Sequence, residues 1–176
     1  MARLHFFLLG LLAACNVFVG ASPALESRDL LGEIIDALGI GLVTHIDVTL
    51  TTATLSNNLV TIDFDAQNPL LFELTVDSVN AAAGLNGTNL ASFQHTFDPH
   101  AVVVPPLGKA NSGNITNVLL TQGVTNSLNF VPFGVLDLTS VSVNVRAGSI
   151  LGIGGIPLVI SGLHQTSVPT TYTLDI

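Results

Sequence analysis

The chain has 176 residues, with 12 acidic and only 4 basic side chains, and its net charge at pH 7 is −8. This balance argues against nucleic acid or an anionic membrane surface as a partner, because both require clustered positive charge. Only 9% of the residues are charged and the mean hydropathy is +0.66, so the chain is apolar for its length. That length fits one domain with one sizeable core.

The first 21 residues have the three parts of a secretory signal peptide. Arg3 supplies the positive start, residues 4–19 are almost wholly apolar, and Val19-Gly20-Ala21 offers the small residues that a signal peptidase reads. Cleavage after Ala21 would remove Cys15, the one cysteine, so the mature chain could form no internal disulfide. We therefore expect a secreted protein, extracellular or in the cell wall, that is held together by its core alone.

A second interpretation of this prefix is a bacterial lipoprotein. Leu12-Ala13-Ala14-Cys15 fits the motif in which the cysteine is lipidated and becomes the mature N-terminus. The apolar run continues past Cys15 through Val19, which favours the signal peptide. After residue 21, no segment reaches the roughly 18 apolar residues of a membrane span, so we expect none.

Residues 24–41 carry the pattern of an amphipathic helix, the one short helix that we expect. Leu30, Leu31, Ile34, Ile35 and Leu38 recur at helical spacing, while acidic residues fall largely on the other side. Such a helix either docks on a partner or packs as a lid across one end of its own sheet, and we favour the lid. Residues 22–45 are therefore interpreted as the helix and its lead-in, and residues 46–176 as the β domain.

From Ile46 onward the apolar period changes to two. Five segments alternate apolar and polar residues, as half-buried antiparallel strands do. The positions on the mainly apolar face of each are Val60, Ile62 and Phe64; Phe72, Leu74 and Val76; Phe93, His95 and Phe97; Val141, Val143 and Val145; and Tyr172, Leu174 and Ile176. Turn signals such as Asn68-Pro69, Asn86-Gly87 and Asp98-Pro99 separate them. Short strands punctuated in this way predict an all-β sandwich or barrel in one domain.

A family resemblance narrows this choice. Val60-Thr61-Ile62-Asp63-Phe64 followed by Gln67-Asn68-Pro69-Leu70, the patch Val104-Pro105-Pro106-Leu107-Gly108-Lys109, and Val168-Pro169-Thr170-Thr171-Tyr172 lie in the order found in one known family. Over residues 46–176 the chain resembles the group-2 late embryogenesis abundant domain, also called the water-stress and hypersensitive-response domain. It is most similar to the secreted fungal relatives of unknown function. The resemblance implies an immunoglobulin-like antiparallel β-sandwich, with roles in stress protection, surface association or binding of a lipid-like ligand.

His95, Asp98 and His100 are the strongest candidates for a metal site. Two imidazoles and a carboxylate within six positions could hold zinc with one coordination position open. However, His95 shares a strand face with Phe93 and Phe97, so we expect it to point inward as a hydrogen-bonded core residue. We therefore assign no metal ligand, no cofactor and no catalytic residue.

Two further features have a more definite interpretation. Asn86-Gly87-Thr88 and Asn114-Ile115-Thr116 fit the acceptor for N-glycosylation, which requires an exposed loop in a secreted protein. Asp63 and Asp65 lie two residues apart on one strand face and could act as an acid–base pair or bind calcium. A solvated strand face is the simpler explanation of the aspartates.

The sequence thus supports a secreted, non-enzymatic surface or matrix protein that binds or protects. Its apolar excess suggests an adhesive face or a groove for a lipid-like ligand, or binding to a cell-wall or matrix component. The candidate surfaces are residues 102–106 and residues 150–160, with core packing as the default for both. The alternative is an extracellular hydrolase with a metal site near His95, Asp98 and His100.

Overall fold

A computed structural model describes residues 41–175. The expected signal peptide, Cys15 and all but Gly41 of the expected helix lie outside the described residues. The elements comprise nine strands, two short α-helices and one 3-10 helix, in the order β1 (Val43–Thr51), α3 (Thr54–Asn57), β2 (Leu59–Gln67), β3 (Leu74–Leu85), β4 (Thr88–Thr96), β5 (Val102–Val104), β6 (Lys109–Asn111), β7 (Ile115–Leu120), α4 (Gly123–Leu128), η1 (Val131–Phe133), β8 (Val135–Ala147) and β9 (Ile156–Asp175).

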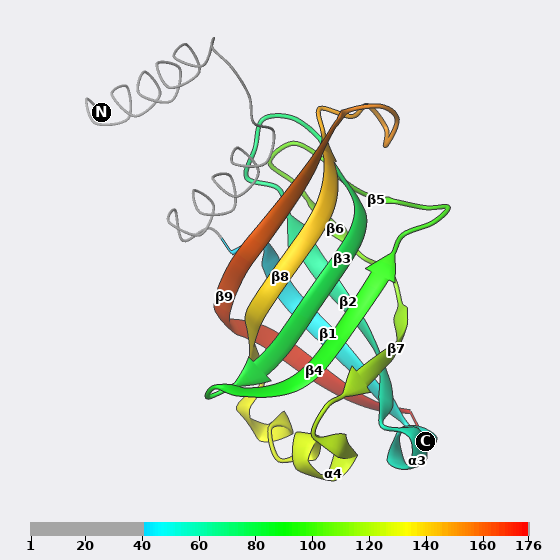
Figure 1. The fold of residues 1–176 in the computed structure, drawn as a ribbon, viewed down its shortest axis with the longest axis vertical. Helices are drawn as coiled ribbons and strands as arrows, with labels where there is room; N and C mark the ends of the chain where they lie inside the picture. Colours follow the sequence, from blue (N-terminus) through cyan, green and yellow to red (C-terminus); the bar gives the residue numbers. More distant parts are fainter. Residues whose placement is uncertain (1–40, 176) are drawn as a thin grey trace, which may run out of the picture.

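Seven of these strands close into a barrel (Figure 1). The strand order is β1-β9-β8-β3-β4-β7-β2, and β2 pairs back onto β1. The β1–β9 pair is parallel, and the other pairs are antiparallel. The short strands β5 and β6 attach to the sides of β3 and β2. The all-β prediction is therefore confirmed.

The immunoglobulin-like sandwich that the resemblance implied is wrong, because the sheet closes. The 20-residue strand β9 makes the closure: its first part pairs with β8 and its last six residues pair with β1. Three register shifts interrupt the β8–β9 ladder, and Gly162 and Ser167 of β9 have positive φ. Irregularities of this kind bend a strand. Strands of sandwiches and barrels both alternate inward and outward residues, so the sequence pattern does not separate the two.

The predicted strands agree with the structure in position but not at every boundary. The first strand begins at Val43, three residues before the start of the expected β domain. Strand β3 begins at Leu74, so Phe72 and Glu73 lie in the preceding loop instead of the strand. The helices α3 and α4 were not expected from the sequence. Neither they nor η1 is long enough to cross a membrane, and residues 41–175 contain no other helix.

The core fills the barrel from the inner strand faces. On β1 the buried residues alternate as Ile46, Val48 and Leu50, and on β2 Val60 and Ile62 do the same. Burying one such aliphatic side chain stabilises the fold by about 1.5–3 kcal/mol. The most deeply buried residues are at most 1% exposed and include Ile115, Val118 and Val168.

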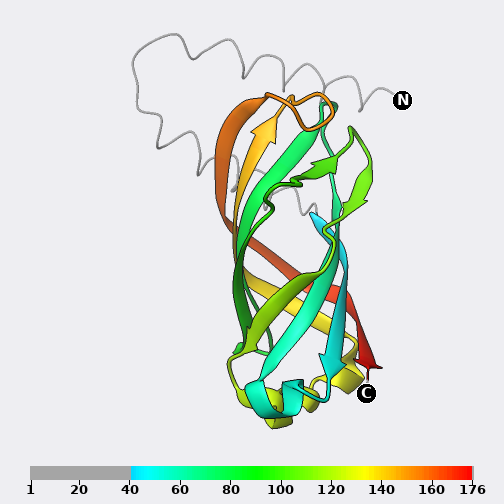
Figure 2. The same cartoon turned by 90° about the vertical axis from the view of Figure 1, so that its right-hand side faces the viewer.

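The two ends of the barrel differ (Figure 2). At one end, which we call the closed end, α3, α4 and η1 lie across the barrel, and Asn58 Oδ1 accepts a 2.9 Å hydrogen bond from the amide of Val124 in α4. A small cluster of Leu85, Leu90 and Leu136, with Phe130 packed against it, fills this end. The opposite end, the open end, carries the loops of residues 68–73, 105–108 and 148–155.

Candidate ligand cavity

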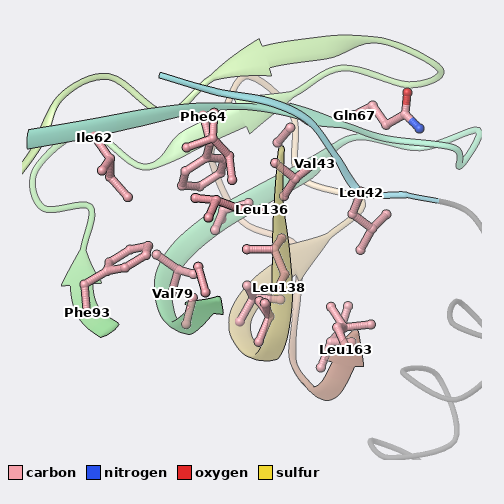
Figure 3. Close-up of a pocket in the computed structure, with 18 of the residues that line it drawn as sticks. Leu42, Val43, Ile62, Phe64, Gln67, Val79, Phe93, Leu136, Leu138 and Leu163 are labelled. Atoms are coloured by element: carbon pink, nitrogen blue, oxygen red, sulfur yellow. The ribbon is translucent and has the colours of Figure 1, made fainter. Parts of the chain in front are cut away.

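The barrel encloses an apolar cavity of about 180 Å³. It extends from Leu42, Pro69 and Phe72 at the open end to Ser127 near the closed end. Side chains from all around the barrel line it (Figure 3); those labelled are Leu42, Val43, Ile62, Phe64, Gln67, Val79, Phe93, Leu136, Leu138 and Leu163. The lining is almost wholly aliphatic and aromatic carbon, so the cavity suits an apolar occupant.

Small side chains on β3 and β4 leave part of this space open. Ala81, Ala83 and Ala91 all line the cavity, and Ala83 lies directly opposite Ala91 in the β3–β4 ladder. Ala81 lies opposite Phe93, which also lines the cavity. Close packing would require larger residues at some of these positions. No sequence pattern marks this cavity, since alanines on a strand face are compatible with a filled core.

Three side chains with polar groups line the cavity, those of Gln67, Ser127 and Tyr172. Gln67 is engaged, because its Nε2 donates a hydrogen bond to the carbonyl of Gly41. The Ser127 hydroxyl is buried and, among residues 41–175, has no hydrogen-bond partner. An unpaired buried hydroxyl costs about 1–3 kcal/mol. The cavity therefore offers an occupant the unused hydroxyl of Ser127 in a largely apolar wall.

Asn68 holds the loops at the open end together. This residue is 2% exposed, and its Nδ2 donates to the carbonyls of Phe72, Val104 and Pro105 at 2.7, 3.2 and 3.2 Å. Its Oδ1 accepts from the amide of Leu70 at 2.9 Å. The Asn68-Pro69 turn predicted from the sequence is therefore present, and its asparagine also fixes the entrance to the cavity.

A charged cluster fixes the 148–155 loop. Arg146 Nε and Nη2 form a bidentate pair with Asp77, with contacts of 2.9 and 2.8 Å, and Arg146 Nη1 donates to the carbonyls of Gly152 and Gly154. From the other side, the Glu73 carboxylate accepts hydrogen bonds from the amides of Leu151 and Gly152. A guanidinium suits this task because it presents several donors in one plane.

Glu73 makes the anchoring of this loop dependent on pH. The hydrogen bond from the Gly152 amide is the main cause that lowers the pKa of Glu73 below its usual 4.5. A lowered carboxyl pKa means that the anchor is complete above pH 4.5 and is lost as the pH falls through the folded-state value. We expect the NMR shifts of the Leu151 and Gly152 amides to titrate with an apparent pKa below 4.5. In Glu73→Gln that titration should vanish, and its persistence would assign the effect to another group.

The structure does not assemble a metal site from His95, Asp98 and His100. His95 is half-buried on the same strand face as Phe97, against which its ring packs edge to face with centroids 4.7 Å apart. Asp98 and His100 are exposed beyond the strand end. Within residues 41–175, no three His, Cys, Asp or Glu side chains lie close enough together to hold a metal ion. His95 thus points inward as expected, although it is only partly buried.

Both predicted glycosylation acceptors are exposed. Asn86 and Gly87 form the two-residue turn between β3 and β4, each with positive φ, and this turn lies at the closed end (Figure 1). Asn114 lies in the loop between β6 and β7. Asn–Gly is the favoured pair for such a hairpin turn. Access to an acceptor side chain is a requirement for glycosylation, and both residues meet it.

The remaining candidates from the sequence separate into buried and exposed groups. Asp63 and Asp65 are bridged by the side-chain amide of Asn111, at 2.8 and 2.9 Å, on the outside of the barrel. Val102 and Val104 are buried in the core, so residues 102–104 are not an adhesive face. Pro105 and Pro106, the rest of that expected surface, are exposed. At the open end, Ile150, Leu151 and Ile153 are 76–84% exposed.

Comparison with known proteins adds little to this description. No protein-family model matches the chain, and no curated protein matches it. Among solved structures, a protein from Archaeoglobus fulgidus is similar over 62% of this chain and 84% of its own, with 12% identity and a TM-score of 0.26. Likeness at this level supports no conclusion about fold or function, so none of the proposals below depends on it.

Proposed function

We propose that the protein is a secreted, non-enzymatic carrier that binds a small apolar, lipid-like ligand inside its barrel. The observation that carries this proposal is the cavity of about 180 Å³ with its almost wholly apolar wall. Apolar cavities of about 150 Å³ stay dry and take up small apolar molecules. The empty space would then be a binding site, which explains why the barrel tolerates the packing defect.

The size and polarity of the cavity limit the ligand. A volume of about 180 Å³ suits a ring-sized molecule or part of one acyl chain, and it is too small for a whole phospholipid. The unpaired Ser127 hydroxyl favours a ligand with one hydroxyl, carbonyl or carboxyl group that reaches the closed end. We therefore propose a single-chain amphiphile, such as a fatty acid or fatty alcohol, as the ligand class.

The signal peptide and the two exposed acceptors, Asn86 and Asn114, support placement of this carrier outside the cell, in the secretion or the wall. The resemblance to the late embryogenesis abundant domain is compatible with an apolar ligand. For the alternative, a hydrolase with a metal site near His95, Asp98 and His100, the described residues offer no observation in favour. A stress-protective role would follow if the carrier sequestered lipids released from damaged membranes.

An introduced tryptophan tests the proposal directly, because the natural chain has none. In Phe93→Trp the indole would lie in the cavity wall, where a fatty acid with a terminal bromine should quench its fluorescence saturably. An unbrominated fatty acid should compete and restore the emission. In the control Gln94→Trp, the neighbouring exposed residue faces outward, so quenching should be weak and linear. Equal, non-saturable quenching in both variants would overturn the proposal.

A further inference from the structure

The open end of the barrel presents a group of unusually exposed apolar side chains, which we call the apolar rim. It consists of Leu71, Leu107, Ile150, Leu151 and Ile153, which are 67–84% exposed. Isolated exposed apolar residues are common on protein surfaces, but a cluster of them indicates an interaction site. The closed end also has exposed apolar residues, but they are less exposed, at 41–66%: Leu55, Leu128, Phe133 and Leu174.

Hydrogen bonds join the three loops of the rim into one surface. The amide of Leu107 donates to the carbonyl of Leu70 at 3.0 Å, which ties the 105–108 loop to the 68–73 loop. The amide of Leu151 donates to Glu73 Oε2 at 3.2 Å, which ties the 148–155 loop to the same segment. The rim is therefore a preformed feature of the fold.

The rim adjoins the entrance of the cavity. Pro69, Leu70 and Phe72 line the cavity, and they flank Leu71, whose side chain is 78% exposed. One short loop thus contributes to both the inner wall and the outer rim. An apolar ligand that leaves through this end would pass from the cavity to the rim with little contact with water.

The charges of the protein near the rim favour a binding partner whose surface has no net charge. Among the described residues the only Lys and Arg are Lys109 and Arg146, and Arg146 is neutralised by its bidentate pair with Asp77. The chain as a whole carries a net charge of −8. Binding to anionic lipids requires several basic residues near the surface, so an anionic bilayer does not fit.

We propose that the apolar rim docks on a zwitterionic phospholipid surface and that the ligand enters and leaves the barrel there. This inference rests on the proposed carrier function and adds the source of its ligand. The side chains project from loop tips, which suits insertion into a fluid interface better than packing against a shaped protein groove. Each inserted Leu or Ile adds apolar burial to the binding.

Flotation with phosphatidylcholine vesicles tests the docking. We expect the purified protein to float with these vesicles, and the double variant Leu151→Ser/Ile153→Ser to bind at least about tenfold more weakly, since it loses two of the most exposed apolar side chains. The matched control Leu55→Ser/Leu174→Ser removes two exposed leucines from the closed end and should bind as the wild type does. Replacing part of the phosphatidylcholine by phosphatidylserine should weaken binding.

Quenching of the tryptophan fluorescence in Phe93→Trp measures ligand binding independently of vesicle binding. It therefore tells whether a negative result contradicts the docking or the carrier function. The rim variant should still bind a brominated fatty acid from solution with unchanged affinity, but should extract it from vesicles more slowly. No flotation of the wild type, with saturable quenching retained, would overturn docking and leave the carrier. Alternatively, the rim could join two copies of the chain. Analytical ultracentrifugation would then show a dimer for the wild type and a monomer for the rim variant, and this result would also overturn the proposal.

Discussion

Asn68→Ala is expected to destabilise the protein by about 3–5 kcal/mol. The substitution removes the buried amide that donates to Phe72, Val104 and Pro105 and accepts from Leu70. A buried polar group left without its partner costs about 1–3 kcal/mol, and several backbone groups here lose the same partner. Urea denaturation followed by circular dichroism measures the change in the free energy of unfolding.

Two further variants define the cause of that loss. In Asn68→Asp the shape is kept but the donor becomes an acceptor that faces three carbonyls, so this variant should be destabilised at pH 7 as well. Asn80 is exposed on β3, and Asn80→Ala should change the free energy of unfolding by no more than about 0.5 kcal/mol. A loss below about 1 kcal/mol in Asn68→Ala would show that water replaces the amide and that the loops do not depend on it.

Ala81→Leu is expected to abolish ligand binding, with an affinity at least about a hundredfold lower, while the fold remains intact. Ala81 is 5% exposed and lines the cavity, so the larger side chain would occupy part of the space that the ligand needs. A leucine placed in a true void gains apolar burial, so stability should stay the same or rise. In a filled core the same change would cost about 1–3 kcal/mol.

Measurements of stability and of ligand binding must therefore be made together on this variant. Quenching in the Phe93→Trp background gives the affinity for the brominated fatty acid, and thermal unfolding gives the stability. The control is Ala82→Leu, because Ala82 is the next residue of β3 and is not part of the cavity wall. Loss of stability in Ala81→Leu, with binding retained, would contradict the cavity as the binding site.

The strands were predictable from the sequence because their periodicity is local. Val60, Ile62 and Phe64 alternate with polar residues in β2, and Val141, Val143 and Val145 do the same in β8. The turn at Asn86-Gly87 follows from the backbone preferences of two adjacent residues. Closure of the sheet was not predictable, because it requires β1 to pair with β9 as well as with β2. Strand β9 lies far from β1 and β2 in the sequence.

For the candidate site, too, local motifs were visible in the sequence, whereas features that depend on long-range contacts were not. The His95, Asp98 and His100 motif was visible in the sequence, yet only His95 lies on β4, and Asp98 and His100 are exposed beyond its end. The cavity had no motif, because it arises where Ala81, Ala83 and Ala91 meet across two strands. The loop anchors Glu73 and Arg146 were also missed, since Asp77 lies 69 residues from Arg146 and Gly152 lies 79 residues from Glu73.

The β class, the order of the principal strands, the main turns and the acidity that disfavours anionic partners all follow from the amino-acid sequence alone. Composition and short-range periodicity carry this information, because each depends on residues within a few positions of one another. The tertiary structure decided that the sheet closes as a barrel, that an apolar cavity remains inside it and that five exposed side chains gather beside its entrance. These features depend on long-range strand pairing and on the volumes of side chains that meet only after folding.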